Sequence, residues 1–489
     1  MIESAIISNE YTDFLSTLSK EELKKFTEFL DSPLFNKNPA QKKLLFELKK
    51  YYPKFISKNY SKENLFKKIY PGKAFTEKRF NNLISEGIKL SNVFLKVCPV
   101  LKNHFRTELA LMDELNMRGL NKNFLRISKK TNERYYNESV YSSKFNDLYL
   151  FEVSALRYEL KKKTRESYKS VKKVQDLWLL SFLNFAFYDI EELLNKNNSD
   201  SSLTLDVIKQ IDLESIVDYV AENYPELSDI YALCYYRMMC LINLSNNEYY
   251  FKLKNVFLKL HSKMTFPMLT ASLRRLNNLC LVKLERLDMN EFSKELFEIH
   301  KLTLELNAFL EGRFNKVFQV NLFHSIINSA LMNNEDEWLY EFINKYIVYV
   351  EKKFRDEYYN LGMLYYFFTK KDFDKCYEHL NKIKFKDINL KTGVRNVLLM
   401  LYYETKNYET AFYLIHSFEK LIKRNDELPQ DFILFENLFI SSYSDLLKFK
   451  TGNKNIDIGY SFNRIKNKFY GEFKWLHEKY EELNTKNPI

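Results

Sequence analysis

The chain has 489 residues, of which 46% are hydrophobic, a formal net charge of +11, and only nine glycines and nine prolines. Sheet-rich and α/β folds need those two residues at turns, at bulges and in phosphate-binding loops, so the composition argues against such folds. A chain of this length without them is expected to be all-α, with more than one core or an elongated array of helices.

The first hundred residues are predicted to form an N-terminal helical module (1–100) of short helices separated by prolines. Ser19 has the residue type and position of a helix N-cap, and Thr76 begins a longer helix that Pro99 is expected to end. The predicted helices cover residues 20–31, 39–52, 62–70 and 76–98.

Residues 101–202 are predicted to form a basic region of two or three long helices, which run from about 105 to 194. The polar segment 195–202, NKNNSDSS, is typical of a linker, and we place the main domain boundary there.

Residues 203–450 contain five similar segments, each with a polar turn, an aromatic or apolar residue and an amphipathic helix. Their equivalent positions recur at intervals of 42, 44, 37 and 35 residues. Such periods predict helix pairs that bury their apolar sides by stacking on neighbouring pairs. The aligned residues are Leu253, Glu295, Leu339, Cys376 and Ala411.

The best-matched part of the chain, residues 358–418, resembles the tetratricopeptide-repeat superfamily. The residues that carry the resemblance are Leu361, Gly362 and Tyr365 in a first helix, and Cys376, Leu380, Ala411 and Ile415 in second helices. The resemblance implies an α-solenoid of antiparallel helix pairs and, by analogy, a surface that binds a protein or peptide.

After the repeats, a helix is predicted from 429 to 449, followed by the C-terminal region 451–489. This region is expected to form one amphipathic helix, from about 461 to 483, that covers the open end of the stack. Its apolar side would consist of Phe469, Phe473, Leu476 and Tyr480.

The sequence contains no glycine-rich phosphate loop, zinc-protease motif or nucleophile elbow. Cys376 and His379 share a helix face, but a zinc site needs two further ligands, so we interpret the pair as core packing. Cys234 and Cys240 lie about 120° apart on a helix and are interpreted in the same way. The acidic cluster 333–337 suits a helix N-terminus, where carboxylates meet the helix dipole.

We therefore predict no catalytic residue, metal or cofactor. A hydrolase assembled from distant residues stays as an alternative, and a deep pocket with two or more carboxylates of shifted pKa would indicate one.

Two features of the sequence bear on the cellular compartment of the protein. Glu3 and Glu10 lie where a secretory signal would carry basic residues before an apolar core, and no apolar run reaches roughly 18 residues. The five cysteines are scattered and odd in number, which is typical of reduced thiols. We expect a cytoplasmic protein without a transmembrane segment.

Positive charge is concentrated in the first third of the chain. Residues 51–173 carry 27 Lys and Arg against 12 Asp and Glu, a net charge of +15. If residues 157–178 form one helix, six basic side chains fall within an arc of about 120°, opposite an apolar seam. These candidate anion- or partner-binding residues are Lys161, Lys162, Arg165, Lys169, Lys172 and Lys173.

Such a stripe suits phosphates, an anionic membrane surface or an acidic partner. The alternative interpretation is a solvated helix face, or one neutralised by the acidic residues of the segment 206–229. The leading functional prediction is a non-enzymatic scaffold that binds a protein or peptide on its helical repeats. The second is a nucleic-acid or ribonucleoprotein binder that acts through residues 51–173.

Overall fold

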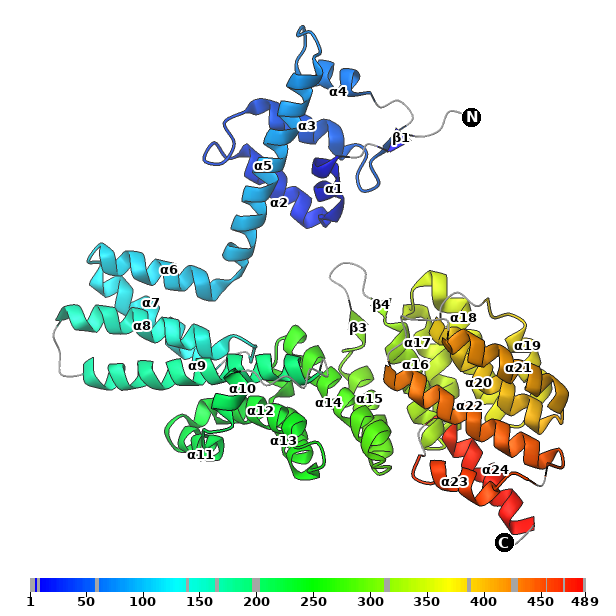
Figure 1. The fold of residues 1–489 in the computed structure, drawn as a ribbon. Coiled ribbons are helices and arrows are strands. Elements are labelled where there is room, and N and C mark those ends of the chain that lie inside the picture. The colour runs from blue at the N-terminus through cyan, green and yellow to red at the C-terminus, as the bar shows by residue number, and fades with distance from the viewer. Residues whose placement is uncertain are drawn as a thin grey trace. The chain divides into compact units, whose positions relative to one another are not determined.

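The computed structural model describes residues 5–6, 9–57, 61–137, 140–162, 167–195, 203–311, 317–384, 388–423, 430–453, 455–468 and 471–486. Within these residues the chain forms 24 α-helices, two short 3-10 helices and two small two-stranded sheets (Figure 1). The predicted all-α class is confirmed. No helix in this part of the chain is both long enough and apolar enough to cross a membrane.

The chain divides into two compact units. Unit 1 contains Met1–Tyr135 and Asp147–Gln175, and unit 2 contains Tyr136–Asn146 and Asp176–Ile489. The division falls within α7 (Asn121–Asn137), α8 (Lys144–Lys162) and α9 (Ser167–Asn195). The linker expected at 195–202 lies, apart from Asn195, outside the described residues, so the expected domain limits stay a prediction.

Unit 1 begins with the short helices that the sequence predicts. Ser19 caps α2 through a reciprocal pair of hydrogen bonds, because its hydroxyl accepts from the Glu22 N–H at 3.1 Å and its own N–H donates to the Glu22 carboxylate. Strands β1 (Ala5–Ile6) and β2 (Ile56–Ser57) pair antiparallel. The helices are α1 (Glu10–Thr17), α2 (Lys20–Asp31), α3 (Pro39–Lys49), α4 (Lys62–Ile69), α5 (Glu77–Lys102) and α6 (His104–Met117).

The helices before residue 195 differ from the prediction in two ways. Pro99 does not end α5, which continues to Lys102, because proline removes only its own N–H and the next turn still closes through Asn103 N–H to the Pro99 carbonyl at 3.0 Å. The segment 105–194 holds four helices, α6 to α9, instead of two or three. Gly119, with φ of +71°, follows α6 in a backbone conformation that few other residues adopt.

Unit 2 continues with fifteen further helices in the described residues. They are α10 (Leu203–Ile208), α11 (Leu213–Asn223), α12 (Pro225–Ile242), α13 (Asn247–Leu260), α14 (Phe266–Leu287), α15 (Phe292–Glu305), α16 (Val320–Met332), α17 (Asp336–Tyr346), α18 (Lys352–Thr369), α19 (Phe373–Leu380), α20 (Ile388–Glu404), α21 (Tyr408–Lys423), α22 (Gln430–Lys450), α23 (Ile458–Ile465) and α24 (Phe473–Lys486). The 3-10 helices are η1 (His261–Lys263) and η2 (Ile347–Tyr349), and β3 (Leu310–Glu311) pairs antiparallel with β4 (Val317–Phe318).

Successive helices of unit 2 pack in pairs: α12 with α13, α14 with α15, α16 with α17, α18 with α19 and α20 with α21. The first helices of neighbouring pairs also touch, as α16 with α18 and α18 with α20. All five aligned positions of the sequence repeat fall in second helices. Leu253, Leu339, Cys376 and Ala411 are buried. Glu295 is half-buried, and its carboxylate pairs with the Lys254 ammonium.

In three of these pairs, the turn between the first and the second helix has the same backbone conformation. Asn334, Lys371 and Lys406 each follow the first helix with a positive φ, between 56° and 61°. The next N–H then donates to a carbonyl five residues earlier, as Glu335 to Ala330, Asp372 to Phe367 and Asn407 to Tyr402. This turn satisfies carbonyl groups that a helix end leaves without partners.

One core runs through the second half of unit 2, from Phe297 to Leu483. The single C-terminal helix expected from 461 to 483 is wrong, because α23 ends at Ile465 and α24 begins at Phe473, after Gly471 with φ of +60°. Of its expected apolar side, Phe473, Leu476 and Tyr480 are fully buried, and Phe469 lies outside the described residues. Helix α24 packs on α22 and α23 (Figure 1).

Candidate functional site

The predicted basic stripe is not on one helix. Lys161 and Lys162 end α8, whereas Lys169, Lys172 and Lys173 lie near the start of α9. Helix α9 runs back along α8, so that Lys173 pairs with Glu152 at 2.7 Å and Ser170 donates to Glu159 at 2.5 Å. The prediction of one helix over 157–178 is therefore wrong.

The structure gives different surroundings to the stripe residues it describes. The Lys161 ammonium is exposed and donates to the carbonyl and side-chain oxygen of Asn116, at 3.2 and 3.0 Å. Lys169 and Lys172 are exposed, and Lys173 is half-buried against Glu152. Arg165 and the side chain of Lys162 lie outside the described residues. Anion or partner binding by these six residues stays a prediction.

A second basic stripe in unit 1 was missed from the sequence. Lys122, Arg126, Lys129 and Lys130 are all exposed on α7, at spacings of four, three and one residues that place them on one side of the helix. The helix is anchored on its other side, where Phe124 stacks on Tyr158 with ring centroids 4.1 Å apart. Helical spacing from Phe124 is the signal that would have revealed this stripe.

In unit 2, the polar side of the C-terminal helix faces the first helices and turns of the repeats. The Lys474 ammonium donates to the carbonyls of Leu331 and Met332 at 3.1 and 3.3 Å and to the side chain of Asn334. Leu331 and Met332 are the last two residues of α16, and Asn334 lies in the turn that joins α16 to α17. Burial lowers the pKa of Lys474.

The same helix contacts α20 through Glu404. The Trp475 indole N–H donates to this carboxylate at 2.8 Å, and the Lys479 ammonium lies 2.9 Å from it. Lys479 also pairs with Glu482 at 2.7 Å. Residues more than seventy positions apart in sequence are thus joined by charge-assisted hydrogen bonds.

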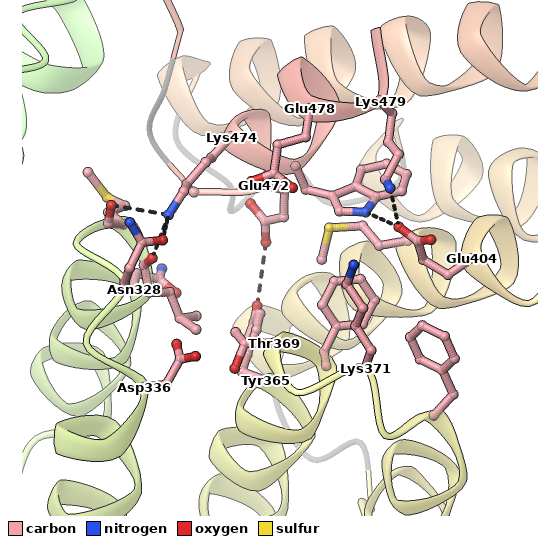
Figure 2. Close-up of a pocket in the computed structure, with 18 of the residues that line it drawn as sticks. Asn328, Asp336, Tyr365, Thr369, Lys371, Glu404, Glu472, Lys474, Glu478 and Lys479 are labelled. Carbon is pink, nitrogen blue, oxygen red and sulfur yellow. Dashed lines mark hydrogen bonds and ion pairs between the residues drawn. The ribbon is translucent and has the colours of Figure 1, made fainter. Parts of the chain in front are cut away.

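Between α24 and the repeats lies a cavity of about 290 Å³ (Figure 2). Aromatic and sulfur-containing side chains form much of its wall, namely Tyr365, Phe368, Phe373, Met332, Met400 and Trp475. Five acidic residues and three lysines also line it: Asp336, Glu404, Glu472, Glu478 and Glu482, with Lys371, Lys474 and Lys479. The wall is therefore amphipathic, with a formal excess of negative charge.

Glu472 contributes a carboxyl group of altered acidity. It accepts a hydrogen bond from the Tyr365 hydroxyl at 3.4 Å (Figure 2), and burial raises its pKa. Beside it, Glu436 accepts from the Asn396 amide at 3.2 Å, and burial together with the Glu472 charge raises the pKa of Glu436 to about 8. Glu472 lines the cavity and Glu436 does not, so one carboxyl group of this pair faces the cavity.

The residues considered as metal ligands occupy core positions. Cys376 is buried, and the His379 ring bonds to the Asn360 side chain at 2.9 Å. Cys234 and Cys240 are also buried, and none of the five cysteines, all of which the structure describes, forms a disulfide. In the described part of the chain, no three His, Cys, Asp or Glu side chains gather closely enough to hold a metal ion.

The acidic cluster 333–337 lies at a helix N-terminus, as the sequence predicts. Asp336 and Glu337 form the first turn of α17. Glu335, at the N-cap, makes no side-chain capping hydrogen bond, whereas Asp336 and Glu337 meet the helix dipole and pair with the Lys370 ammonium at 3.4 and 2.8 Å.

The cavity residues of α24 could not be assigned from the sequence. In the sequence, the helical spacing of Phe473, Leu476 and Tyr480 indicates which side of the helix is apolar, and the opposite side is therefore polar. What that polar side would meet depends on how α24 folds back on the repeats. No family model, curated protein or solved structure matches the chain.

Proposed function

We propose that the protein is a non-enzymatic interaction scaffold whose paired helices are tetratricopeptide-like units and whose partner is a peptide or protein. The observation that carries this proposal is the cavity beneath α24, which combines aromatic walls with an acidic excess. Such a wall suits a basic side chain with an apolar stem, because the ammonium or guanidinium meets carboxylates while the methylene groups cover aromatic faces.

Three further features support a binding site at this place. The turns after α16, α18 and α20 each carry exposed residues, and the Lys474 ammonium already contacts the first of these turns. A lysine of the chain thus illustrates the kind of contact that a basic partner would make. The fully buried Phe473, Leu476 and Tyr480 hold α24 in the core, so the cavity is formed before any partner binds.

The test uses the full chain and a fluorescent peptide that alternates lysine and phenylalanine. Binding is measured by anisotropy, and a peptide with glutamate in place of lysine is the comparison. Glu478→Lys, at an exposed position on the cavity wall, is expected to weaken binding roughly fivefold or more, because it reverses one charge beside the bound cation.

Glu409→Lys on α21 is the matched control, since Glu409 is exposed and lies outside the cavity wall. Equal affinity of the Glu478→Lys and Glu409→Lys variants for the basic peptide would contradict the proposal. So would equal binding of the lysine and glutamate peptides by the unmodified protein.

A second candidate function, binding of nucleic acid through residues 51–173, is favoured by the exposed stripe on α7. Four cations at helical spacing can each neutralise a phosphate, and counterion release then makes the affinity fall steeply with salt. A gel shift with an RNA hairpin and a DNA duplex at low salt tests this candidate. Replacing Lys122, Arg126 and Lys129 by Gln is expected to abolish the shift.

The control replaces three exposed lysines of unit 2, Lys294, Lys352 and Lys420, by Gln. A further variant, with Lys161, Lys169 and Lys172 replaced by Gln, shows whether the residues predicted from sequence take part. Absence of any salt-sensitive shift with the unmodified protein would count against this candidate.

A further inference from the structure

The turn between α6 and α7 in unit 1 exposes apolar side chains. Met117, the last residue of α6, is 69% exposed, and Leu120, at the end of the turn, is 46% exposed. Leu125, in the second turn of α7, is 52% exposed. One exposed apolar residue needs no explanation, but three of them around a single helix connection indicate a surface for a partner.

The backbone holds this turn in one conformation. Gly119 has φ of +71°, and the N–H groups of Gly119 and Leu120 donate to the carbonyls of Asn116 and Leu115 at 3.3 and 2.9 Å. These two bonds form a Schellman motif, a common helix end that glycine favours. Leu115 and Phe124 are buried in a core that α6 and α7 share with α8. The exposed side chains therefore lie on a convex surface that is formed without a partner.

Positive charge lies next to the apolar side chains. Leu125 comes three residues after Lys122 and four before Lys129, so the three side chains are neighbours on the surface of α7. Lys122 and Arg126 are exposed, and neither forms an ion pair within the residues that the structure describes. Lys129 makes a long contact, 4.0 Å from its ammonium to the Glu133 carboxylate, and both side chains are exposed. Such cations are available to an anionic partner.

The end of α8 extends the same surface. The Lys161 ammonium donates to the Asn116 carbonyl and side-chain oxygen, so α8 ends beside the turn between α6 and α7. Leu160, the neighbour of Lys161 in sequence, is also exposed. Within the turn, Arg118 is exposed and pairs with Glu114 at 3.0 Å. Apolar and cationic side chains thus occur together at the turn and at the end of α8.

The combination of residues distinguishes between kinds of partner. A nucleic acid would bind the cations through its phosphates and would leave Met117 and Leu120 in water. A peptide partner usually binds in a groove, whereas a turn between two helices is convex. An anionic lipid bilayer suits both kinds of residue, because apolar side chains enter the boundary of the acyl chains, about 5–10 Å deep, while cations stay at the charged headgroups.

We propose that unit 1 binds anionic lipid bilayers through this surface. Met117 and Leu120 enter the bilayer interface, and the lipid headgroups are met by Lys122, Arg126 and Lys161. The surface is separate from the cavity beneath α24 and does not depend on the scaffold function. Because the nucleic-acid candidate uses some of the same cations, the experiment has one arm for each partner.

The experiment is sedimentation of the full chain with vesicles of phosphatidylcholine that contain about 30% phosphatidylserine, and with vesicles of phosphatidylcholine alone. The protein is expected to bind the anionic vesicles roughly tenfold or more tightly than the neutral ones. Met117→Ser combined with Leu120→Ser is expected to weaken this binding roughly tenfold or more, because two apolar side chains no longer leave water. Lys122→Gln combined with Arg126→Gln is expected to weaken it roughly 25-fold, since each cation near the bilayer contributes a factor of about five.

The matched controls remove exposed side chains of the same kinds from the first part of unit 1. Leu34→Ser combined with Phe46→Ser removes two apolar side chains, and Lys24→Gln combined with Lys25→Gln removes two cations. Both controls are expected to bind anionic vesicles as the unmodified protein does. Thermal unfolding of each variant shows that it is folded.

The second arm is a gel shift of an RNA hairpin by the same variants. Loss of vesicle binding in the Met117→Ser, Leu120→Ser variant supports the proposal, whether or not RNA binds. Absence of binding to anionic vesicles overturns it, and a shift of the hairpin without vesicle binding assigns the surface to nucleic acid instead. Equal vesicle binding by this variant and its apolar control overturns the proposal as well.

Discussion

Gly362 on α18 lies so close to Ile343 on α17 that a β-carbon at position 362 would be 2.8 Å from Cδ1 and 3.0 Å from Cγ1 of the isoleucine. Cδ1 of Ile327 from α16 would be 3.4 Å from the same β-carbon. Three helices from two neighbouring pairs therefore meet at one glycine. This is the glycine on which the resemblance to tetratricopeptide repeats rests, and the structure gives it a packing reason.

We expect Gly362→Ala to destabilise unit 2 by about 1 kcal/mol. Overpacking costs about 1–3 kcal/mol, and the better helix propensity of alanine offsets about 1 kcal/mol of that. In the Ile343→Val background, which removes the closest methyl group, Gly362→Ala should be neutral or stabilising. Urea unfolding followed by tryptophan fluorescence measures both effects. An equal loss of stability in the two backgrounds would show that the close contact with Ile343 is not the cause.

The turn after α20 offers a stabilising substitution. Lys406 has φ of +61°, a conformation that costs a residue with a β-carbon roughly 1–2 kcal/mol and costs glycine little. Lys406→Gly is expected to raise the free energy of unfolding by about 0.5–1 kcal/mol. Lys420→Gly, within helix α21, should lower it. A loss of stability in Lys406→Gly would mean that the lysine side chain stabilises the turn by a contact of its own.

The His300 imidazole should make unit 2 less stable in acid. It is fully buried, its Nδ1 lies 2.7 Å from the Ser329 hydroxyl, and burial lowers its pKa from 6.5 to about 3. Between these values the unfolded chain binds a proton that the folded chain does not. The free energy of unfolding therefore falls with decreasing pH, by up to about 1.4 kcal/mol per pH unit from this residue.

His300→Gln should remove this part of the acid slope, whereas His416→Gln, at an exposed position, should leave the slope unchanged. The measurement is denaturant unfolding at several values between pH 7 and pH 4. An unaltered slope in His300→Gln would mean that this histidine is protonated in the folded protein.

Glu436 should make unit 2 less stable as the pH rises, which is opposite to the effect of His300. Its pKa is raised to about 8, mainly by burial and then by the neighbouring Glu472. The folded protein thus retains a proton between pH 4.5 and pH 8 that the unfolded chain has lost. This contribution to stability is fully present below about pH 4.5 and disappears as the pH rises through 8.

Glu436→Gln is neutral and of similar shape, so its stability should exceed that of the unmodified protein above pH 8 and approach it near pH 5. Glu409→Gln, at an exposed site, is the control. The comparison is the difference in free energy of unfolding at pH 5 and pH 9. No pH dependence of that difference would show that Glu436 is ionised throughout.

Local rules account for what could be predicted along the chain. The cap at Ser19, the helices that follow it and the burial of Cys376 and Ala411 depend on neighbours within one or two turns, and the structure confirms them. The errors at Pro99 and in the C-terminal segment concern where helices end. A helix end depends on hydrogen bonds and packing with other parts of the chain as much as on its own residues.

The candidate sites also depend on contacts between distant residues, which local patterns in the sequence do not predict. Glu404 meets Trp475 and Lys479, and Glu191 meets Arg237 and Arg275, yet no spacing within the sequence joins these residues. The periodicity of each helix indicates which side is polar. It does not indicate which polar side of another helix will lie opposite.

By itself, the sequence determined the all-α class, the regular spacing of helix pairs in the second half of the chain and the concentration of positive charge before residue 174. These follow from propensity, period and composition, which are summed along the chain. Only the tertiary structure decided that the basic stripe of 161–173 is divided between two antiparallel helices. Only the tertiary structure brought α24 against the turns of the repeats and placed the end of α8 beside the turn between α6 and α7, because contacts between distant helices arise from packing that no local pattern records.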